Sequence, residues 1–259
     1  MFRTPSSPQG PQKPCGTSSA TNTPGQTCDP ILLLLHQKKS SAGAVGAWLE
    51  HHGYRLDIKR PTLGEDLPQS LENHAGLIVF GGPMSANDET PEIKSEIDWL
   101  ALALQENIPY FGICLGAQLM VRQLGGTVTP EKNGLVEVGY HPVRPTSAGR
   151  QLTSQWSDKY FQWHKEGFSL PSGAVQLASG ERFEHQAFSY AKHVFGVQFH
   201  PEITKPIMRR WSLAAAHMLT KKGAHNAERL LADHQKYGAA QQDWLNQFMN
   251  HWTSLFKPR

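Results

Sequence analysis

The sequence GICLG at residues 112–116 constrains the fold of this chain more than any other feature. The residues before its cysteine, 108–113, are mostly apolar and partly β-branched or aromatic, which predicts a short buried strand. The residues after it, 117–124, place apolar side chains at helical spacing. A strand, a sharp turn and a helix in this order form a nucleophile elbow, here with Cys114 in place of serine.

An elbow of this kind places the thiol of Cys114 at the carboxyl-terminal edge of a sheet and at the start of a helix. The flanking glycines allow two backbone segments to pass close together while the turn residue is strained. The helix N-terminus carries partial positive charge and free N–H groups, which favour a thiolate and any anion beside it. The alternative interpretation is a buried structural cysteine in a turn bounded by glycines.

The segments before the elbow predict a parallel sheet. Residues 31–35 and 54–58 have the character of buried strands, and residues 41–53 between them have that of a helix, which together make a β-α-β unit. A third strand is expected at residues 77–80 and a helix at residues 91–105. We therefore predict a flavodoxin-like, open and mostly parallel α/β sheet with helices on both faces, and a site at its carboxyl-terminal edge.

The sequence changes character after the elbow helix. Short antiparallel strands and hairpins are expected at 127–129, 136–140, 141–145 and 174–179, and residues 187–190 and 194–198 return to the main sheet. Residues 205–257 are expected to be helical, with helices at 207–219 and 227–255 and a break near Gly238. Within the second helix, aromatic residues recur at every fourth position, which favours a packed face over a cofactor site: Trp244, Phe248, Trp252 and Phe256.

Residues 1–29 are rich in Ser, Thr, Pro, Gly and Gln and almost lack apolar side chains. Such a segment cannot bury enough surface to offset its ordering entropy, so we expect a disordered extension before one domain at residues 30–259. The segment also lacks an apolar signal region, and no stretch of the chain has the length of a membrane span. Three cysteines, Cys15, Cys28 and Cys114, make a disulfide framework improbable, and we expect a cytoplasmic protein.

The composition excludes several classes of function. A formal net charge of +3 without a basic stripe interleaved with aromatics argues against nucleic-acid binding. The chain contains no CxxC, HExxH or comparable spacing of metal ligands, and we expect neither a metal nor another cofactor. It contains no P-loop and no SGGxDS pyrophosphatase loop, so it cannot itself activate an acceptor with ATP.

A second group of residues, FHPE at 199–202, supplies what a nucleophilic cysteine needs. Imidazole can accept the thiol proton and later protonate a leaving amine near neutral pH. Because Pro201 favours an extended conformation for His200, residues two apart point the same way, and the carboxylate of Glu202 can reach the ring. A surface histidine in a proline turn is the alternative interpretation.

A third group, GGP at 81–83, directly follows a predicted strand and should lie at the same sheet edge as the elbow. The N–H group of Gly82 and that of Leu115, the residue after the cysteine, could together form an oxyanion hole. The alternative is a plain Gly-Pro turn.

The phrases GGPMS, GICLGAQ and FHPE, in this order, resemble the triad-type (class I) glutamine amidotransferases, and most of all the stand-alone group similar to the glutaminase domain of GMP synthetase. The resemblance extends from residue 31 to the C-terminus. It implies Cys114 as nucleophile, His200 as base and Glu202 as its orienting acid. It also implies Gly82 and Leu115 as oxyanion donors.

The resemblance further implies contacts to the substrate. Gln118, in the first turn of the elbow helix, would help to hold the amide or glutamyl group. Glu137, Gly139 and Tyr140 would lie near the glutamyl amino and carboxylate groups, although relatives often carry Trp in place of Tyr140. His164, in the segment FQWHKEG at 161–167, is a candidate contact at the pocket mouth.

From these residues we predict a hydrolase of a γ-glutamyl amide bond, in glutamine or in a γ-glutamyl amine or peptide, that acts through a γ-glutamyl thioester on Cys114. One alternative is a glutaminase subunit that supplies ammonia to a separate synthase partner, and another is an inactive regulatory relative. The C-terminal helices could cover the sheet or form an interface between copies of the chain. An α/β-hydrolase would place its acid before a distant histidine, and the intracellular-protease-like proteins usually carry His directly after the cysteine, where this chain has Leu115.

Overall fold

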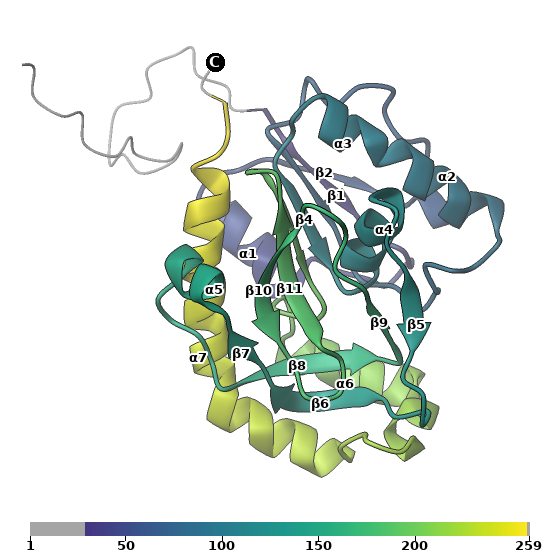
Figure 1. Ribbon diagram of the computed structural model, residues 1–259, viewed down its shortest axis with the longest axis vertical. Coiled ribbons are helices and arrows are strands. Elements are labelled where there is room, and N and C mark those ends of the chain that lie inside the picture. Colours follow the sequence, from purple (N-terminus) through teal and green to yellow (C-terminus); the bar gives the residue numbers. More distant parts are fainter. Residues whose placement is uncertain (1–28, 258–259) are drawn as a thin grey trace, which may run out of the picture.

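The computed structural model describes residues 29–257, so nearly all of the predicted N-terminal extension, with Cys15 and Cys28, lies outside the described residues. Within them, an eight-stranded sheet forms the centre of the fold (Figure 1). Its strand order is β2 (Leu56–Lys59), β1 (Ile31–Leu34), β3 (Gly76–Val79), β4 (Tyr110–Ile113), β12 (Val194–Val197), β11 (His185–Tyr190), β10 (Val175–Ser179) and β7 (Arg144–Pro145).

The strands from β2 to β12 pair in parallel, whereas β11, β10 and β7 extend the sheet with antiparallel pairs. The parallel order β2-β1-β3-β4-β12 is flavodoxin-like, and the predicted fold class is confirmed. Strand β1 is buried along its whole length because the sheet is covered on both faces. Its alternating side chains enter different cores: Ile31 and Leu33 on one face, Leu32 and Leu34 on the other.

Helices cover both faces, as the sequence predicts (Figure 1). Residues of α1 (Gly43–His51) and α7 (Ala227–Thr253) pack on the face that carries Ile31 and Leu33. The opposite face is covered by α2 (Pro91–Trp99), α3 (Ala101–Gln105) and α4 (Leu115–Gln123). The aromatic stripe of α7 is a packed face, as predicted, since Trp244, Phe248 and Trp252 are almost completely buried in the first core.

Smaller elements lie beside the carboxyl-terminal edge of the parallel strands. Two antiparallel pairs join β5 (Val128–Pro130) to β9 (Glu166–Phe168) and β6 (Glu137–Pro142) to β8 (Lys159–His164). The short helix α6 (Lys205–Ala214) packs with β6, β8 and the start of α7 through a third apolar cluster. The remaining elements are α5 (Ser147–Leu152) and two 3-10 turns, η1 (Pro61–Leu63) and η2 (Ala216–Thr220).

Several predicted element boundaries are wrong. The helix expected at 91–105 is divided at Leu100, whose N–H bonds to the carbonyls of both Glu96 and Ile97 and so tightens the turn. The helix expected at 207–219 ends at Ala214 and continues as a 3-10 turn. The strand boundary expected between residues 140 and 141 falls inside β6. Its partner strand β8 was not predicted, because the segment at 161–167 was interpreted only as lining the pocket mouth.

The break expected near Gly238 is also wrong, because α7 continues through it without interruption. A glycine inside a helix costs about 1 kcal/mol relative to alanine. The burial of Leu230 before it and of Trp244 and Phe248 after it outweighs this cost.

The parallel strands bring four short segments to one edge of the sheet. Residues at or just beyond the carboxyl ends of β1, β3, β4 and β12 lie there: His36, Gly81, Cys114 and Gln198. In an open parallel sheet this edge is where ligands bind. The fold thus brings four separate parts of the sequence together, three of which contain predicted functional residues.

Candidate active site

Cys114 lies in the turn between β4 and α4, in the strained conformation that the elbow predicts. Its φ of 51° and ψ of −103° fall in a region that residues with side chains rarely adopt. The two glycines are required by close backbone approach: a Cβ at Gly112 would lie 2.7 Å from the amide nitrogen of Ala117, and one at Gly116 only 2.1 Å from the carbonyl oxygen of Val79. The elbow geometry therefore follows from the GICLG sequence.

His200 and Glu202 form the predicted pair just after β12. Nδ1 of His200 lies 2.8 Å from Oε1 of Glu202, and both residues are buried. The backbone of His200 is fixed on both sides, since its N–H donates to the carbonyl of Phe161 and its carbonyl accepts from the side chain of Gln241. Nε2 of His200 is buried and makes no hydrogen bond with the described residues, which leaves it available for a proton transfer.

The surroundings of His200 raise the pKa of its imidazole. Burial lowers the pKa of His200, but the negative charges of Glu202 and Cys114 outweigh burial and raise the pKa to about 10. Cys114 is itself nearly buried, and a Cβ added at Gly81 would lie 2.8 Å from Cε1 of His200 and 3.6 Å from Cβ of Cys114. The cysteine and histidine side chains thus border the same point beside Gly81.

Gly82 and Leu115, the predicted oxyanion donors, are neighbours. A Cβ at Gly82 would meet a methyl group of Leu115 at 3.0 Å. The N–H of Gly82 donates no hydrogen bond to any described residue, and the N–H of Leu115, at the first position of α4, has no partner within the helix. Gly82 and Leu115 are thus in contact, and neither backbone N–H has a partner among the described residues.

A chain of amide side chains runs from the cysteine into the protein. The side-chain amide of Gln198 donates to Sγ of Cys114 over 3.5 Å, and its oxygen accepts from Nε2 of Gln118 at 3.1 Å. Nε2 of Gln118 also donates to the carbonyl of Glu166 at 2.9 Å. Gln118, the predicted substrate contact, is thus connected to the sulfur of Cys114 through Gln198.

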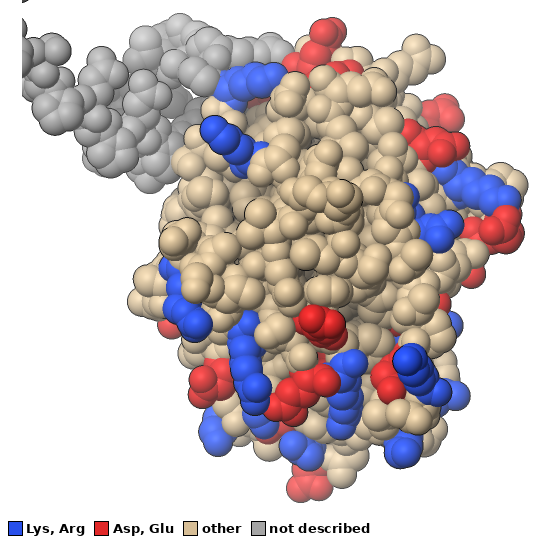
Figure 2. All heavy atoms as spheres, viewed as in Figure 1, with Lys and Arg blue, Asp and Glu red and all other residues tan. Residues whose placement is uncertain are grey.

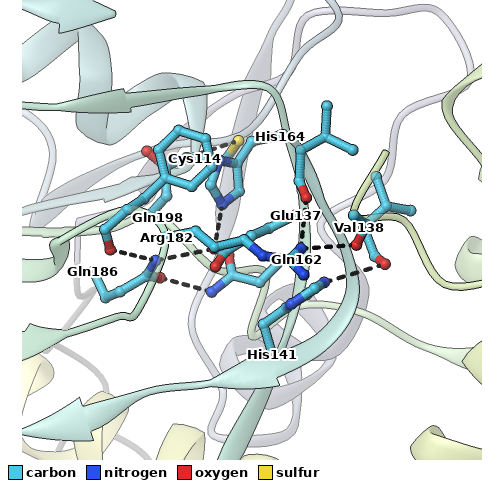
Figure 3. Close-up of polar contacts among 12 residues, drawn as sticks. Cys114, Glu137, Val138, His141, Gln162, His164, Arg182, Gln186 and Gln198 are labelled. Atoms are coloured by element: carbon cyan, nitrogen blue, oxygen red, sulfur yellow. Dashed lines mark hydrogen bonds and ion pairs between the residues drawn. The ribbon is translucent and has the colours of Figure 1, made fainter. Parts of the chain in front are cut away.

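The cluster continues through His164 and Glu137 (Figure 3). Nε2 of His164 lies 3.2 Å from Oε2 of Glu137, and its Nδ1 lies 3.0 Å from the carbonyl of Glu166. The same Glu137 oxygen accepts from Gln186, whose own amide oxygen accepts from Gln162. Burial raises the pKa of Glu137, but its hydrogen bond to His164 and the charge of that histidine outweigh burial, so the pKa is lowered.

Two other predicted substrate contacts, Tyr140 and Gly139, take no part in this hydrogen-bond network through their side chains. Tyr140 is fully buried between β6 and α7, where its hydroxyl lies 2.7 Å from Nδ1 of His234 and its ring contacts Phe161 and Tyr237. Its side chain is therefore apart from the cluster around Glu137. Gly139 has a φ of 109°, and a Cβ there would lie 2.6 Å from Nδ1 of His225, so this position requires glycine.

Sequence reasoning missed Gln198, Gln186 and a buried pair formed by His36 and Glu96, with 3.0 Å between Nε2 and Oε1. Gln198 could have been found by the argument used for His200, since residues two apart in extended chain face the same side. His36 follows the first strand and belongs to the same sheet edge as Gly81. Its partner is 60 residues away, and no local pattern identifies such a pair.

A small hollow and a larger one lie near these residues. One, of about 20 Å³, is bordered by Gly81, Glu202 and Trp211 and has room for about one water molecule. The other, of about 390 Å³, lies along β6 and carries mixed charges, among them Glu137, Lys159 and Arg182.

Figure 2 likewise shows acidic and basic side chains intermixed on the lower part of the face shown, where β6 and β8 lie in Figure 1. Among residues 29–257, no group of three or more His, Cys, Asp or Glu side chains is placed to hold a metal ion. In the same part of the chain, none of the helices combines the length and the apolar character needed to span a membrane.

Comparisons with known proteins point in one direction. The family described as glutamine amidotransferase class-I matches residues 41–210. A putative glutamine amidotransferase-like protein of Salmonella typhimurium, YfeJ, is 33% identical over 185 residues, which cover 67% of this chain and 76% of that protein. A glutamine-hydrolyzing GMP synthase of Prochlorococcus marinus is 41% identical over 136 residues, 51% of this chain and 24% of the synthase.

Among solved structures, a glutamine amido transferase from Methylobacillus flagellatus superposes with a TM-score of 0.84. The likeness covers 90% of this chain and 97% of that one at 24% sequence identity, and it shows the shared fold. The chain thus matches most of the length of one curated relative and about a quarter of the length of the synthase.

Proposed function

The chain belongs to the class I glutamine amidotransferase family, and we propose that within it the protein is a cysteine-dependent hydrolase of γ-glutamyl amide bonds. The observation that carries this proposal is the convergence at one sheet edge of Cys114 in a strained elbow and His200 bonded to Glu202 at 2.8 Å. These residue types in this arrangement provide a nucleophile, a proton carrier and an orienting acid.

In the first half of the reaction, the thiolate of Cys114 attacks the γ-carbonyl carbon of the substrate. The carbonyl oxygen becomes an oxyanion, which the N–H groups of Gly82 and Leu115 stabilise. The carbon–nitrogen bond then breaks, and the imidazolium of His200 gives its Nε2 proton to the departing ammonia or amine. A γ-glutamyl thioester on Cys114 remains.

In the second half, His200 accepts a proton from a water molecule that attacks the thioester carbonyl. The same two amides stabilise the second oxyanion, and the carbon–sulfur bond breaks to release glutamate and restore the thiolate. Glu202 keeps the ring oriented through Nδ1 and stabilises its positive charge in both halves.

We assign recognition of the glutamyl half to the cluster beside the cysteine. Gln118 and His164 carry polar groups in the network that reaches Sγ, and Glu137 supplies a buried carboxylate suited to an ammonium group. Gly139 and Tyr140 contribute indirectly, by setting the position of β6. Gly139 allows the backbone to pass His225, and Tyr140 packs this strand on α7.

The second candidate is a glutaminase subunit that delivers ammonia to a separate synthase. The observation in its favour is the match to GMP synthases, which covers about a quarter of the length of those proteins. In that case a synthase partner would complete the site, and glutamine would be the substrate.

Assay of the purified full chain against glutamine and a panel of γ-glutamyl amines and peptides separates the two. Our proposal predicts turnover of at least one γ-glutamyl compound by the chain alone, with a kcat of about 1 to 1,000 per second. Negligible turnover of every compound, with activity appearing only on addition of a co-purifying synthase, would select the second candidate.

The raised pKa of His200 predicts the high-pH side of the activity profile. The imidazolium must carry the proton for the leaving amine, so kcat/KM should fall as pH rises through about 10. Replacing Glu202 by Gln removes a negative charge that raises this pKa, and the alkaline fall should move to lower pH. Measurement of kcat/KM from neutral to alkaline pH for both proteins tests this, and an unmoved alkaline fall in E202Q would contradict it.

The same shift affects stability. Because the pKa of His200 is raised above its ordinary value of 6.5, the protonated pair stabilises the fold fully below that pH, and this contribution is lost as pH rises through about 10. Thermal melts should therefore show a larger loss of stability at alkaline pH in the unmodified chain than in E202Q.

A further inference from the structure

His36 and Glu96 form a buried ion pair directly behind the loop of Gly81 and Gly82. Glu96 lies on α2, and neither side chain of the pair is exposed to solvent. Nε2 of His36 lies 3.0 Å and 3.3 Å from the two carboxylate oxygens, and Nδ1 lies 3.3 Å from the carbonyl oxygen of Gly81. Neither side chain forms a hydrogen bond or an ion pair with Cys114 or His200, and the reaction described above does not use the pair.

The hydrogen-bond partners determine the protonation of the ring. A carboxylate and a carbonyl oxygen only accept, so both nitrogens of His36 must donate, which requires the imidazolium form. Burial lowers the pKa of His36, but the charge of Glu96 and the hydrogen bonds to Glu96, Gly81 and Phe80 outweigh burial and raise it. A protonated Nδ1 donor therefore faces the Gly81 carbonyl.

The orientation of that carbonyl fixes the next N–H group. The peptide bonds of the described residues are all trans, so the carbonyl of Gly81 and the N–H of Gly82 point in opposite directions in one plane. With the carbonyl directed at His36, the N–H is directed away from it. That N–H has no partner among the described residues. Gly82 adjoins Leu115, and Gly81 adjoins Cys114 and His200.

We propose that His36, held by Glu96, is a positioning residue that fixes the Gly81–Gly82 peptide with the Gly82 N–H directed at the oxyanion. Rotation of this peptide would replace a donor by a carbonyl oxygen at the point where negative charge develops. This inference rests on the proposed γ-glutamyl chemistry, in which the Gly82 N–H stabilises the oxyanion. The position of the peptide itself can be observed without any substrate.

Two double variants separate the hydrogen bond from the buried charge. In both, Glu96→Gln removes the carboxylate, so that no lone ion remains buried. H36N/E96Q keeps an amide donor near the position of Nδ1, whereas H36A/E96Q removes it. The control is D57N/H74A, which breaks another His–carboxylate pair with Nε2 and Oδ2 also 3.0 Å apart. Asp57 lies on β2, and His74 lies just before β3, at the strand end opposite to Gly81.

Removal of one oxyanion donor typically lowers kcat by about 10²- to 10³-fold. We expect kcat of H36A/E96Q to be at least about tenfold below that of H36N/E96Q and to approach this full loss. The KM values of the two variants should agree within a few-fold. The rate of Cys114 alkylation by iodoacetamide should be equal in the two, because displacement at a saturated carbon forms no oxyanion. The control should retain the kcat of the unmodified chain.

Equal kcat values in the two variants, or a parallel loss of kcat and alkylation, would overturn the proposal. Crystal structures of both variants test the positioning step independently of turnover. The Gly81 carbonyl should still face residue 36 in H36N/E96Q and should have turned or become disordered in H36A/E96Q, and an unchanged peptide in H36A/E96Q would also overturn it. If the unmodified chain hydrolyses no γ-glutamyl compound, the proposed function fails, and the two crystal structures still decide whether His36 holds the peptide.

Discussion

Replacement of Cys114 by alanine should abolish γ-glutamyl hydrolysis, with a loss in kcat of about 10⁵- to 10⁶-fold, as is usual when a covalent nucleophile is removed. The side chains that continue the hydrogen-bond network from its sulfur, Gln198 and Gln118, carry only amides and cannot replace it as a nucleophile. The side chain lost is small, so the melting temperature should change little. Steady-state assays at high enzyme concentration and thermal melts measure the two effects.

The cysteines near the N-terminus provide the control. Exchange of Cys28 for serine should leave kcat unchanged, and a glutamine-like diazo ketone should label Cys114 alone. Residual activity of C114A within tenfold of the unmodified chain, or loss of activity in C28S, would contradict the assignment of the nucleophile.

His200→Ala should be nearly as damaging, with kcat lowered by about 10⁴- to 10⁶-fold, because both the acceptor of the thiol proton and the donor to the leaving amine are lost. This variant also leaves the carboxylate of Glu202 buried without its partner, so it should melt at a lower temperature. His200→Asn separates the two effects, since its amide can still donate to Glu202 but provides no base. We expect it to be as inactive as the alanine variant and more stable.

Glu202→Gln should be less damaging than either, because an amide oxygen can still orient the ring but stabilises the imidazolium less well. A kcat for E202Q at or below that of His200→Ala would show that Glu202 does more than orient and stabilise the ring. Equal melting temperatures for the alanine and asparagine variants would indicate that the bond to Glu202 contributes little to the fold.

The elbow and the His-Pro-Glu pair could be predicted because their geometry is local. A Cβ at Gly112 would lie 2.7 Å from the amide nitrogen of Ala117 in the same elbow, and this requirement is visible in the sequence as a glycine. His200 and Glu202 were expected on one side because residues two apart in an extended chain point the same way. The parallel sheet followed from apolar strands alternating with helices, and its covered faces explain the continuous apolar run of β1.

The residues that support these groups could not be predicted, since their partners are distant in sequence. Glu96 lies 60 residues from His36, and Gln186 lies 49 residues from Glu137. Strand β8 has a polar and aromatic sequence, and its pairing with β6 is defined by packing on α7 rather than by a local pattern. The continuity of α7 through Gly238 likewise reflects tertiary packing that overrides local propensity.

The most direct test of the account is detection of the covalent intermediate. The full chain is mixed with a γ-glutamyl amide that it hydrolyses, quenched in acid within the first turnovers, and analysed by mass spectrometry intact and after digestion. We predict a mass increase of one γ-glutamyl group on the peptide that contains Cys114, absent from C114A and removed by hydroxylamine, which cleaves thioesters. Rapid turnover with no adduct under these conditions, or an adduct on another residue, would contradict the thioester mechanism.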